Sequence, residues 1–153
     1  MVATMTKDED VICAAVLHDT IEDCPGVTAE VLSARFGGRV AGMVVEESED
    51  KSKSWEERKG TTIRNIKDAP REIQMIGLAD KLSNMRDIDR DYPVLGEQLW
   101  MRFRMQSKQA IGWYYKGIRD ALKGSFEGVP VYGEYCELVK KHFGEEPASL
   151  EWS

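Results

Sequence analysis

The stretch from Ile73 to Arg90 constrains the fold most strongly. Its apolar residues recur at the three- and four-residue spacing that places side chains on one face of an α-helix. The wide apolar stripe consists of Met75, Ile76, Leu78, Ala79, Leu82 and Met85. A stripe of this width is typical of a helix that packs against other helices. No segment of the chain sustains the strict alternation of a β-strand, so the sequence predicts an all-α fold.

Glycines, prolines and capping residues indicate where the helices begin and end. We expect helices over residues 8–17, 28–36, 40–47, 55–67, 73–90, 95–101, 105–122 and 132–143. Thr6, with Glu9 three residues later, is expected to cap the first helix. Tyr92-Pro93 is expected to end the long helix, and Gly144 to end the last one.

The length and composition fit one globular domain. The 153 residues are enough to bury a sizeable core, and we expect a single domain over residues 1–153 with a tail at 145–153. The net charge of −6 argues against nucleic acid or a membrane surface as a partner, although a local basic pocket still permits an anionic small molecule. The three cysteines have no paired spacing, and the N-terminus has no signal-peptide pattern, which favours a cytoplasmic protein.

A dense group of polar residues follows the apolar run that starts at Ala14. His18, Asp19, Glu22 and Asp23 fall within six residues that contain no lysine or arginine, so ion pairing within the stretch does not explain them. On a continuous helix His18 and Glu22 share one face, as do Asp19 and Asp23. This pattern indicates a metal site that takes further ligands from elsewhere in the chain.

Asp80 lies within the apolar stripe of the long predicted helix. A buried carboxylate is costly unless it is paired or bound to a metal. A salt bridge with Lys81 or Arg86 is one explanation, and a position at the edge of a narrower stripe is another. Together with the His18-Asp19 pair, Asp80 is interpreted as a distant metal ligand.

The two motifs together resemble a known family. The pairing of LHDTIED, residues 17–23, with LADKLSNM, residues 78–85, resembles the HD-domain metal-dependent phosphohydrolases. Within that family the chain is similar to the hydrolase domain of RelA/SpoT-type alarmone enzymes and to small alarmone hydrolases. The resemblance runs from about Val11 to Arg90 and implies an HD-domain helical bundle. It also implies a nucleotide substrate and the reaction of a guanosine-3′,5′-bis(diphosphate) 3′-pyrophosphohydrolase.

The resemblance implies roles for five of these residues. His18, Asp19 and Asp80 match the ligands of a divalent metal ion, expected to be Mn²⁺. Glu22 and Asp23 match the acidic pair that positions and activates a metal-bound water. The chemistry agrees, because imidazole and carboxylates suit Mn²⁺ and a bound metal lowers the pKa of water.

Other residues are expected to contact the substrate. Asn84 matches the asparagine that faces the nucleotide in the family. Lys51, Arg58 and Lys59 lie in the most basic segment and are candidates for the phosphate groups, although each also suits a solvated surface. The aromatic residues at 113–115 can stack a base, but such a cluster is more often part of a core.

One feature departs from the family. Its metal site also uses an earlier histidine, and residues 1–17 contain none. We therefore expect a chain that lacks the N-terminal helices of the family and self-associates as a homodimer through the apolar surface left exposed. We consider His142 a weak candidate to replace the missing histidine ligand. The alternatives are a degenerate HD domain that binds a nucleotide or a protein, and an HD hydrolase of another nucleotide or phosphate ester.

Overall fold

The computed structural model describes residues 2–17, 24, 26–47, 52–103 and 105–148. The regular structure of this part is entirely helical, which confirms the predicted all-α fold class. The elements are η1 (Val2–Thr4), α1 (Glu9–Leu17), α3 (Ala29–Phe36), α4 (Gly38–Glu47), α5 (Trp55–Asp68), α6 (Arg71–Leu95), η2 (Gly96–Arg102), α7 (Lys108–Phe126) and α8 (Pro130–Phe143). Among the described helices, none combines the length and the apolar character needed to cross a membrane.

Local side-chain caps explain several helix starts. The Thr28 hydroxyl accepts a hydrogen bond from the Val31 amide and begins α3, as the sequence predicted. The cap predicted for α1 was wrong by two residues, because Asp8 rather than Thr6 caps the helix, which begins at Glu9. The Thr6 hydroxyl bonds the Asp8 amide, and the Asp8 carboxylate accepts from the Asp10 amide at the start of the helix. Asp8 takes the capping position because aspartate caps at least as well as threonine.

The end of α6 also differs from the prediction. Pro93 lies inside the helix, which continues to Leu95. A proline there cannot donate a hydrogen bond to the carbonyl four residues earlier, but its fixed φ angle suits a helix, and only two residues follow it before the helix ends. Gly96 ends the helix instead, with a φ of 58° that glycine adopts easily. The segment predicted as a helix over 95–101 is the tighter 3₁₀ helix η2.

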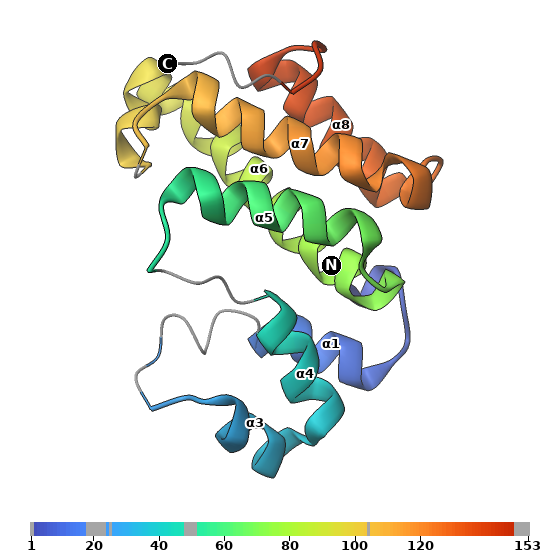
Figure 1. The fold of residues 1–153 in the computed structure, drawn as a ribbon. Helices are drawn as coiled ribbons and strands as arrows, with labels where there is room; N and C mark the ends of the chain where they lie inside the picture. Colours follow the sequence, from blue (N-terminus) through green and yellow to red (C-terminus); the bar gives the residue numbers. More distant parts are fainter. Residues whose placement is uncertain (1, 18–23, 25, 48–51, 104, 149–153) are drawn as a thin grey trace.

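Two hydrophobic clusters share α6. In Figure 1, α1, α3 and α4 lie in the lower half of the view, and α5, α7 and α8 lie in the upper half. The N-terminal cluster is built from η1, α1, α3, α4 and the start of α6. The C-terminal cluster is built from α5, the rest of α6, η2, α7 and α8. Ile73, Ile76 and Ala79 of α6 belong to the first cluster, whereas Leu78, Leu82 and Met85 belong to the second. Helix α6 therefore belongs to both clusters, and different residues of the helix pack in each one.

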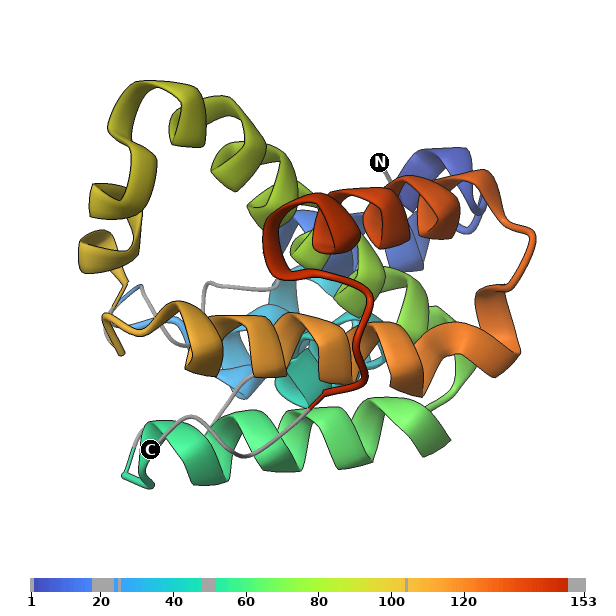
Figure 2. The same cartoon turned by 90° about the horizontal axis from the view of Figure 1, so that it is seen from above.

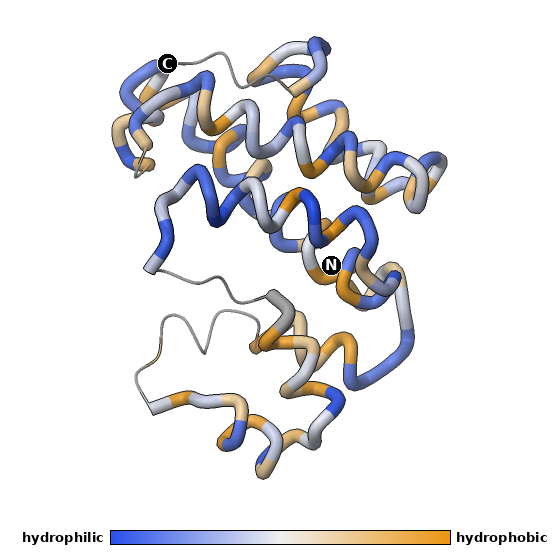
Figure 3. Tube along the Cα trace, in the orientation of Figure 1, coloured by the Kyte–Doolittle hydropathy of each residue, from blue (hydrophilic) through white to orange (hydrophobic). Residues whose placement is uncertain are grey.

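In the C-terminal part, α5 and α7 run side by side (Figure 2). Gly117 of α7 permits this close approach, because a Cβ atom there would lie 2.5 Å from Cδ1 of Ile63. Most of α5 is hydrophilic (Figure 3), and its buried residues are Arg58 and Ile66. The helix thus covers one side of the bundle and exposes a polar face to water.

Candidate functional site

A cavity of about 460 Å³ opens between the start of α5, the second half of α6, η2 and the start of α7. A volume of this order suits a small-molecule ligand. The lining residues are Trp55, Lys59, Lys81, Asn84, Asp87, Ile88, Arg90, Asp91, Leu99, Arg102, Phe103, Ile111, Tyr114 and Tyr115. Four of these side chains are basic and two are acidic, so the cavity is locally cationic in a chain of net charge −6.

Two lysines approach the same aromatic ring in this cavity. The ammonium nitrogen of Lys59, from α5, lies 4.9 Å from the centre of the Tyr114 ring. The ammonium nitrogen of Lys81, from α6, lies 5.2 Å from the same centre. Both distances are within the range of a cation–π contact. Two positively charged side chains from different helices therefore contact the Tyr114 ring.

Lys81 also forms an ion pair with Asp80. Its Nζ lies 2.7 Å from Asp80 Oδ2, and the two side chains are only 12% and 22% exposed. Burial by itself lowers the pKa of Lys81, but Tyr114, Asp80 and Tyr115 outweigh it, so this pKa lies well above the ordinary lysine value. Of the two ion-pair partners considered from the sequence, Lys81 is the one in contact, because Arg86 instead pairs with Glu134 of α8 at 2.7 Å.

The remaining charged residues form a chain of ion pairs along the cavity. Arg90 Nε donates to Asp91 Oδ1 at 3.1 Å, and Arg102 Nη1 donates to Asp91 Oδ2 at 3.3 Å. The guanidinium of Arg90 is the main reason that the pKa of Asp91 lies below its usual range. Asp87 adds a further contact, 3.3 Å from Arg90. These pairs connect α6 to η2.

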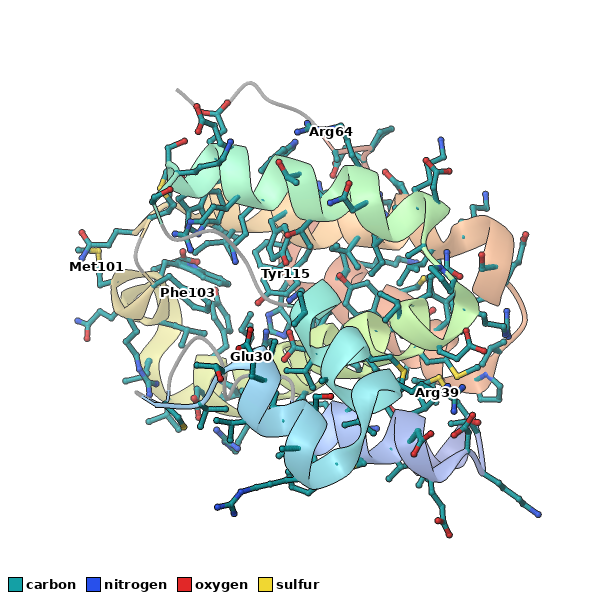
Figure 4. All side chains as sticks on the ribbon, turned by 60° about the horizontal axis from the view of Figure 1, so that its bottom comes forward. Glu30, Arg39, Arg64, Met101, Phe103 and Tyr115 are labelled. Atoms are coloured by element: carbon teal, nitrogen blue, oxygen red, sulfur yellow. The ribbon has the colours of Figure 1, made fainter. Side chains whose placement is uncertain are left out.

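Aromatic side chains form the apolar wall of the cavity. Trp55 of α5 meets Tyr114 edge to face, with 6.2 Å between ring centres. Phe103, which follows η2, and Tyr115, from α7, also line the cavity and are labelled in Figure 4. Burial raises the pKa of the Tyr115 hydroxyl, which keeps it neutral at ordinary pH. The wall therefore offers flat, uncharged surface next to the basic residues.

Three of the substrate and metal residues predicted from the sequence lie at or beside this cavity. Asn84 and Lys59 line it, and Asp80 sits one helical turn before Asn84 and is bonded to the lining residue Lys81. Arg58 is 8% exposed on α5 and is not among the lining residues. Lys51 lies outside the described residues.

His18, Asp19, Glu22 and Asp23 also lie outside the described residues. Within the described part no three histidine, cysteine or acidic side chains come together as a metal site. However, α1 ends at Leu17, and Leu17 packs on the same N-terminal cluster that includes Ala79, the neighbour of Asp80. Asp80 is a partly buried carboxylate at the cavity, and one imidazole with two carboxylates is a donor set that Mn²⁺ accepts. Of the three expected ligands, Asp80 lies in the part of the chain that the structure describes, and its carboxylate suits a divalent metal ion.

His142 is tied to another part of the protein. Its side chain is 4% exposed, and Nε2 lies 2.9 Å from Asp89 Oδ1. The Tyr92 ring meets the imidazole edge to face at 5.5 Å. His142 is absent from the cavity lining. Its contacts attach α8 to α6, which agrees with the low weight given to it as a metal ligand.

No sequence pattern selected Arg90, Arg102 or Phe103 as site residues. Arg90 ends the predicted amphipathic pattern, and the other two lie between the helices predicted over 95–101 and 105–122. Only the turn at Gly96 returns the chain beside α6 and brings Arg102 to Asp91. A signal was present in the Tyr114-Tyr115 pair, which lines the cavity while also packing in the C-terminal cluster.

Comparison with known proteins identifies similar sequences and similar folds. The chain is 41% identical over 86 residues to the guanosine-3′,5′-bis(diphosphate) 3′-pyrophosphohydrolase MESH1 of Drosophila melanogaster, covering 56% of this chain and 48% of that one. A crystal structure of lmo0812 from Listeria monocytogenes EGD-e superposes with a TM-score of 0.81, at 33% identity and 90% coverage of both chains. A metazoan ortholog of SpoT, described as hydrolysing ppGpp, gives a TM-score of 0.76 at 28% identity, over 94% of this chain and 75% of that one.

The chain spans about half of the length of the first curated relatives that it matches, with 48% of the Drosophila melanogaster protein and 59% of the Danio rerio protein covered. The sequence model of the HD domain matches residues 1–99, which include the motifs at 17–23 and 78–85. The family expected from those motifs is thereby confirmed, and the chain belongs to the HD-domain family.

Proposed function

We propose that this chain is a metal-dependent nucleotide phosphohydrolase that removes the 3′-pyrophosphate of guanosine-3′,5′-bis(diphosphate). The observation that carries the proposal is the cavity of about 460 Å³, which combines basic side chains, an aromatic wall and Asn84 next to Asp80. Two relatives support the substrate, because MESH1 is named as a hydrolase of this nucleotide and the metazoan ortholog of SpoT is described as hydrolysing ppGpp.

The charges of the cavity favour an anion with several phosphate groups. Lys59 and Lys81 form one basic group at Tyr114, and Arg90 and Arg102 form a second at Asp91. A nucleotide that carries two diphosphates presents two separate anionic ends, and two basic groups can bind them at once. Lysine acts as a compact point charge, whereas arginine can bind two phosphate oxygens together.

The aromatic wall favours a ligand with a flat ring. Trp55, Phe103 and Tyr115 contribute side chains to the same cavity. An aromatic side chain stacks on a nucleobase with a gain of about 1–3 kcal/mol per base. A phosphate ester without a base gains nothing from this wall, which favours a nucleotide over a simple phosphate ester.

His18, Asp19 and Asp80 are the residues that we propose to hold Mn²⁺. When bound, the ion acts as a Lewis acid on phosphate oxygens and lowers the pKa of water. Glu22 or Asp23 accepts the proton of the attacking water as general base, and the other carboxylate orients that water. Asn84, one turn after Asp80, donates or accepts a hydrogen bond at the nucleotide.

Release of pyrophosphate from ppGpp in the presence of Mn²⁺ tests the proposal. We expect the wild type to release pyrophosphate, and both Asp80→Ala and His18→Ala to lower the rate to background and to lower the Mn²⁺ content. Asp68→Ala, which removes an exposed carboxylate at the end of α5, is the control and is expected to behave like the wild type.

The same experiment separates the alternatives. A protein that binds ppGpp without hydrolysing it is a degenerate HD domain that serves as a binding module. Hydrolysis of other nucleotides in preference to ppGpp points to another phosphohydrolase. If Asp80→Ala and His18→Ala leave both metal content and hydrolysis unchanged, the proposed metal centre is wrong.

The homodimer and the cytoplasmic location remain predictions. Exposed apolar side chains of the N-terminal part support self-association, and they are Val16, Val31, Phe36 and Val45. Cys13, Cys24 and Cys136 are free thiols, which agrees with a reducing compartment.

A further inference from the structure

Lys81 has two possible partners within the candidate site. Its ammonium group contacts the Asp80 carboxylate at 2.7 Å, and its side chain also lines the cavity in which Lys59 and Tyr114 lie. We propose that Lys81 couples metal binding to anion binding by exchanging Asp80 for a phosphate group of the ligand when Asp80 binds the metal. This inference rests on the proposed function, because it requires Asp80 to be a metal ligand.

The first step of the argument is electrostatic. A divalent cation bound to the Asp80 carboxylate is a few ångströms from an ammonium group that bonds the same carboxylate. Like charges at such a separation repel strongly where water is partly excluded. Here the two side chains are 12% and 22% exposed, so solvent screens the repulsion only in part. Metal binding at Asp80 therefore favours departure of the Lys81 ammonium group.

The second step concerns the place to which the Lys81 ammonium group can move. The Lys81 ammonium already lies 5.2 Å from the centre of the Tyr114 ring, inside the cavity. The Lys59 ammonium lies 4.9 Å from the same ring. A phosphate group in the cavity can accept hydrogen bonds from the Lys81 ammonium group, and the flexible four-carbon stem of lysine allows the movement.

The third step is the consequence for binding. Before the metal binds, the Asp80 carboxylate holds the Lys81 ammonium group at 2.7 Å. After the metal binds, the Lys81 ammonium group can bind a phosphate group in the cavity. Each ligand then strengthens the binding of the other by the same factor, because coupling between two binding sites is reciprocal.

Lys59 provides a matched control. Both lysines line the cavity and approach the same ring, but Lys81 is the one that bonds the Asp80 carboxylate at 2.7 Å. Lys81→Met and Lys59→Met each remove one positive charge and keep an unbranched side chain of similar length. Their effects on phosphate binding should resemble each other when Mn²⁺ is present and differ when it is absent, and their effects on metal binding should also differ.

Titration of Mn²⁺ into the full chain by calorimetry is the first measurement. We expect Lys81→Met to bind Mn²⁺ about tenfold more tightly than the wild type, a size within the usual range of coupled sites. Lys59→Met should bind Mn²⁺ within about twofold of the wild type, and Lys81→Arg should do the same because it retains the charge beside Asp80. Thermal unfolding of each variant verifies that it folds.

Titration of inorganic phosphate with and without Mn²⁺ is the second measurement. Lys81→Met should weaken phosphate binding about tenfold with Mn²⁺ and leave it unchanged without Mn²⁺. Lys59→Met should weaken it by similar factors in both conditions. A lysine with a purely structural role does not produce this dependence on the metal.

The outcomes distinguish the inference from the function on which it rests. If the wild type binds Mn²⁺ and Lys81→Met binds it equally or more weakly, the exchange of partners is wrong and the metal centre stands. Equal loss of phosphate binding with and without Mn²⁺ in Lys81→Met also overturns the exchange. If the wild type binds no Mn²⁺, both the metal centre and the exchange are wrong.

Discussion

The two parts of the molecule that meet along α6 differ in composition and in packing. The N-terminal cluster consists mainly of valine, alanine, leucine and isoleucine side chains. The C-terminal cluster contains several fully or nearly buried aromatic residues, among them Trp100, Tyr114, Phe126 and Tyr135. Helix α3 packs principally on α4, whereas α5 and α8 each contact two other helices and α7 contacts three. The C-terminal part therefore has the more extensive core.

This difference corresponds to a division of the candidate site. All residues that line the cavity come from the C-terminal part, from Trp55 to Tyr115. Four of the residues that we propose for metal and proton chemistry follow α1 of the N-terminal part. Asp80 and Lys81 lie where α6 passes from one cluster to the other, between Ala79 and Leu82. In the proposed site, the cavity therefore belongs to the better packed part, and the proposed metal ligand Asp80 lies at the boundary between the two clusters.

The largest expected effect comes from a matched pair of leucine substitutions. Leu82 is 0% exposed in the C-terminal cluster, and Leu32 is 3% exposed on α3 in the N-terminal cluster. Leucine-to-alanine substitutions in cores cost about 2–5 kcal/mol, depending on how far the site can collapse. We expect Leu82→Ala near the upper end and Leu32→Ala near the lower end, because α3 can readjust on α4 alone. Urea titration gives both free energies of unfolding.

Amide hydrogen exchange tests the same comparison between the two clusters. Leu32→Ala should speed amide exchange in α3 and α4 and leave α7 protected, whereas Leu82→Ala should speed exchange throughout the chain. Equal losses of stability, with equal exchange patterns, would mean that the two clusters unfold as one unit.

An intermediate effect is expected at the junction of α6 and α8. Asp89 contacts both Lys141, at 2.7 Å, and His142, at 2.9 Å. These two residues, Lys141 first, hold the pKa of Asp89 below its usual range. The folded-state pKa lies below the unfolded value of about 3.9, so the contribution of Asp89 is present above about pH 4 and is lost as the pH falls through the folded-state pKa.

Asp89→Asn tests this contribution. Its melting temperature should fall below that of the wild type at pH 6 to 7, and the two should converge as the pH decreases through the folded-state pKa. Circular dichroism melts across this range measure the difference. A difference in melting temperature between the two proteins that stays constant down to about pH 2 would show that the charge of Asp89 contributes nothing to stability.

The smallest effect is expected in the N-terminal part, at Arg39. Its guanidinium contacts Asp8 at 2.7 Å and Asp10 at 3.2 Å, but the arginine side chain is 50% exposed. Exposed pairs of this kind contribute little and are screened by salt. Arg39→Gln should be indistinguishable from the wild type in a urea titration at high salt. A clear loss of stability at high salt would indicate that the N-terminal part depends on this pair more than on its apolar core.

Much of the fold followed from local signals. The apolar spacing of α6, the Thr28 cap of α3 and the Gly144 end of α8 were all predictable from neighbouring residues. The errors occurred where two signals compete. Asp8 and Thr6 are both good caps, and Pro93 is compatible with a last helical turn, so Gly96 ends α6 instead.

The sequence by itself determined the family and the all-α fold, because the motifs around His18 and Asp80 and the helical spacing are properties of short segments. It also singled out Asp80 by its place in an apolar helix face, Asn84 by its match to the family motif, and Lys59 by its place in the most basic segment. The tertiary structure alone decided that Arg102 and Phe103 join the cavity and that Lys81 holds Asp80. Such contacts depend on how the chain turns back along α6 after Gly96, and residue spacing does not encode that arrangement.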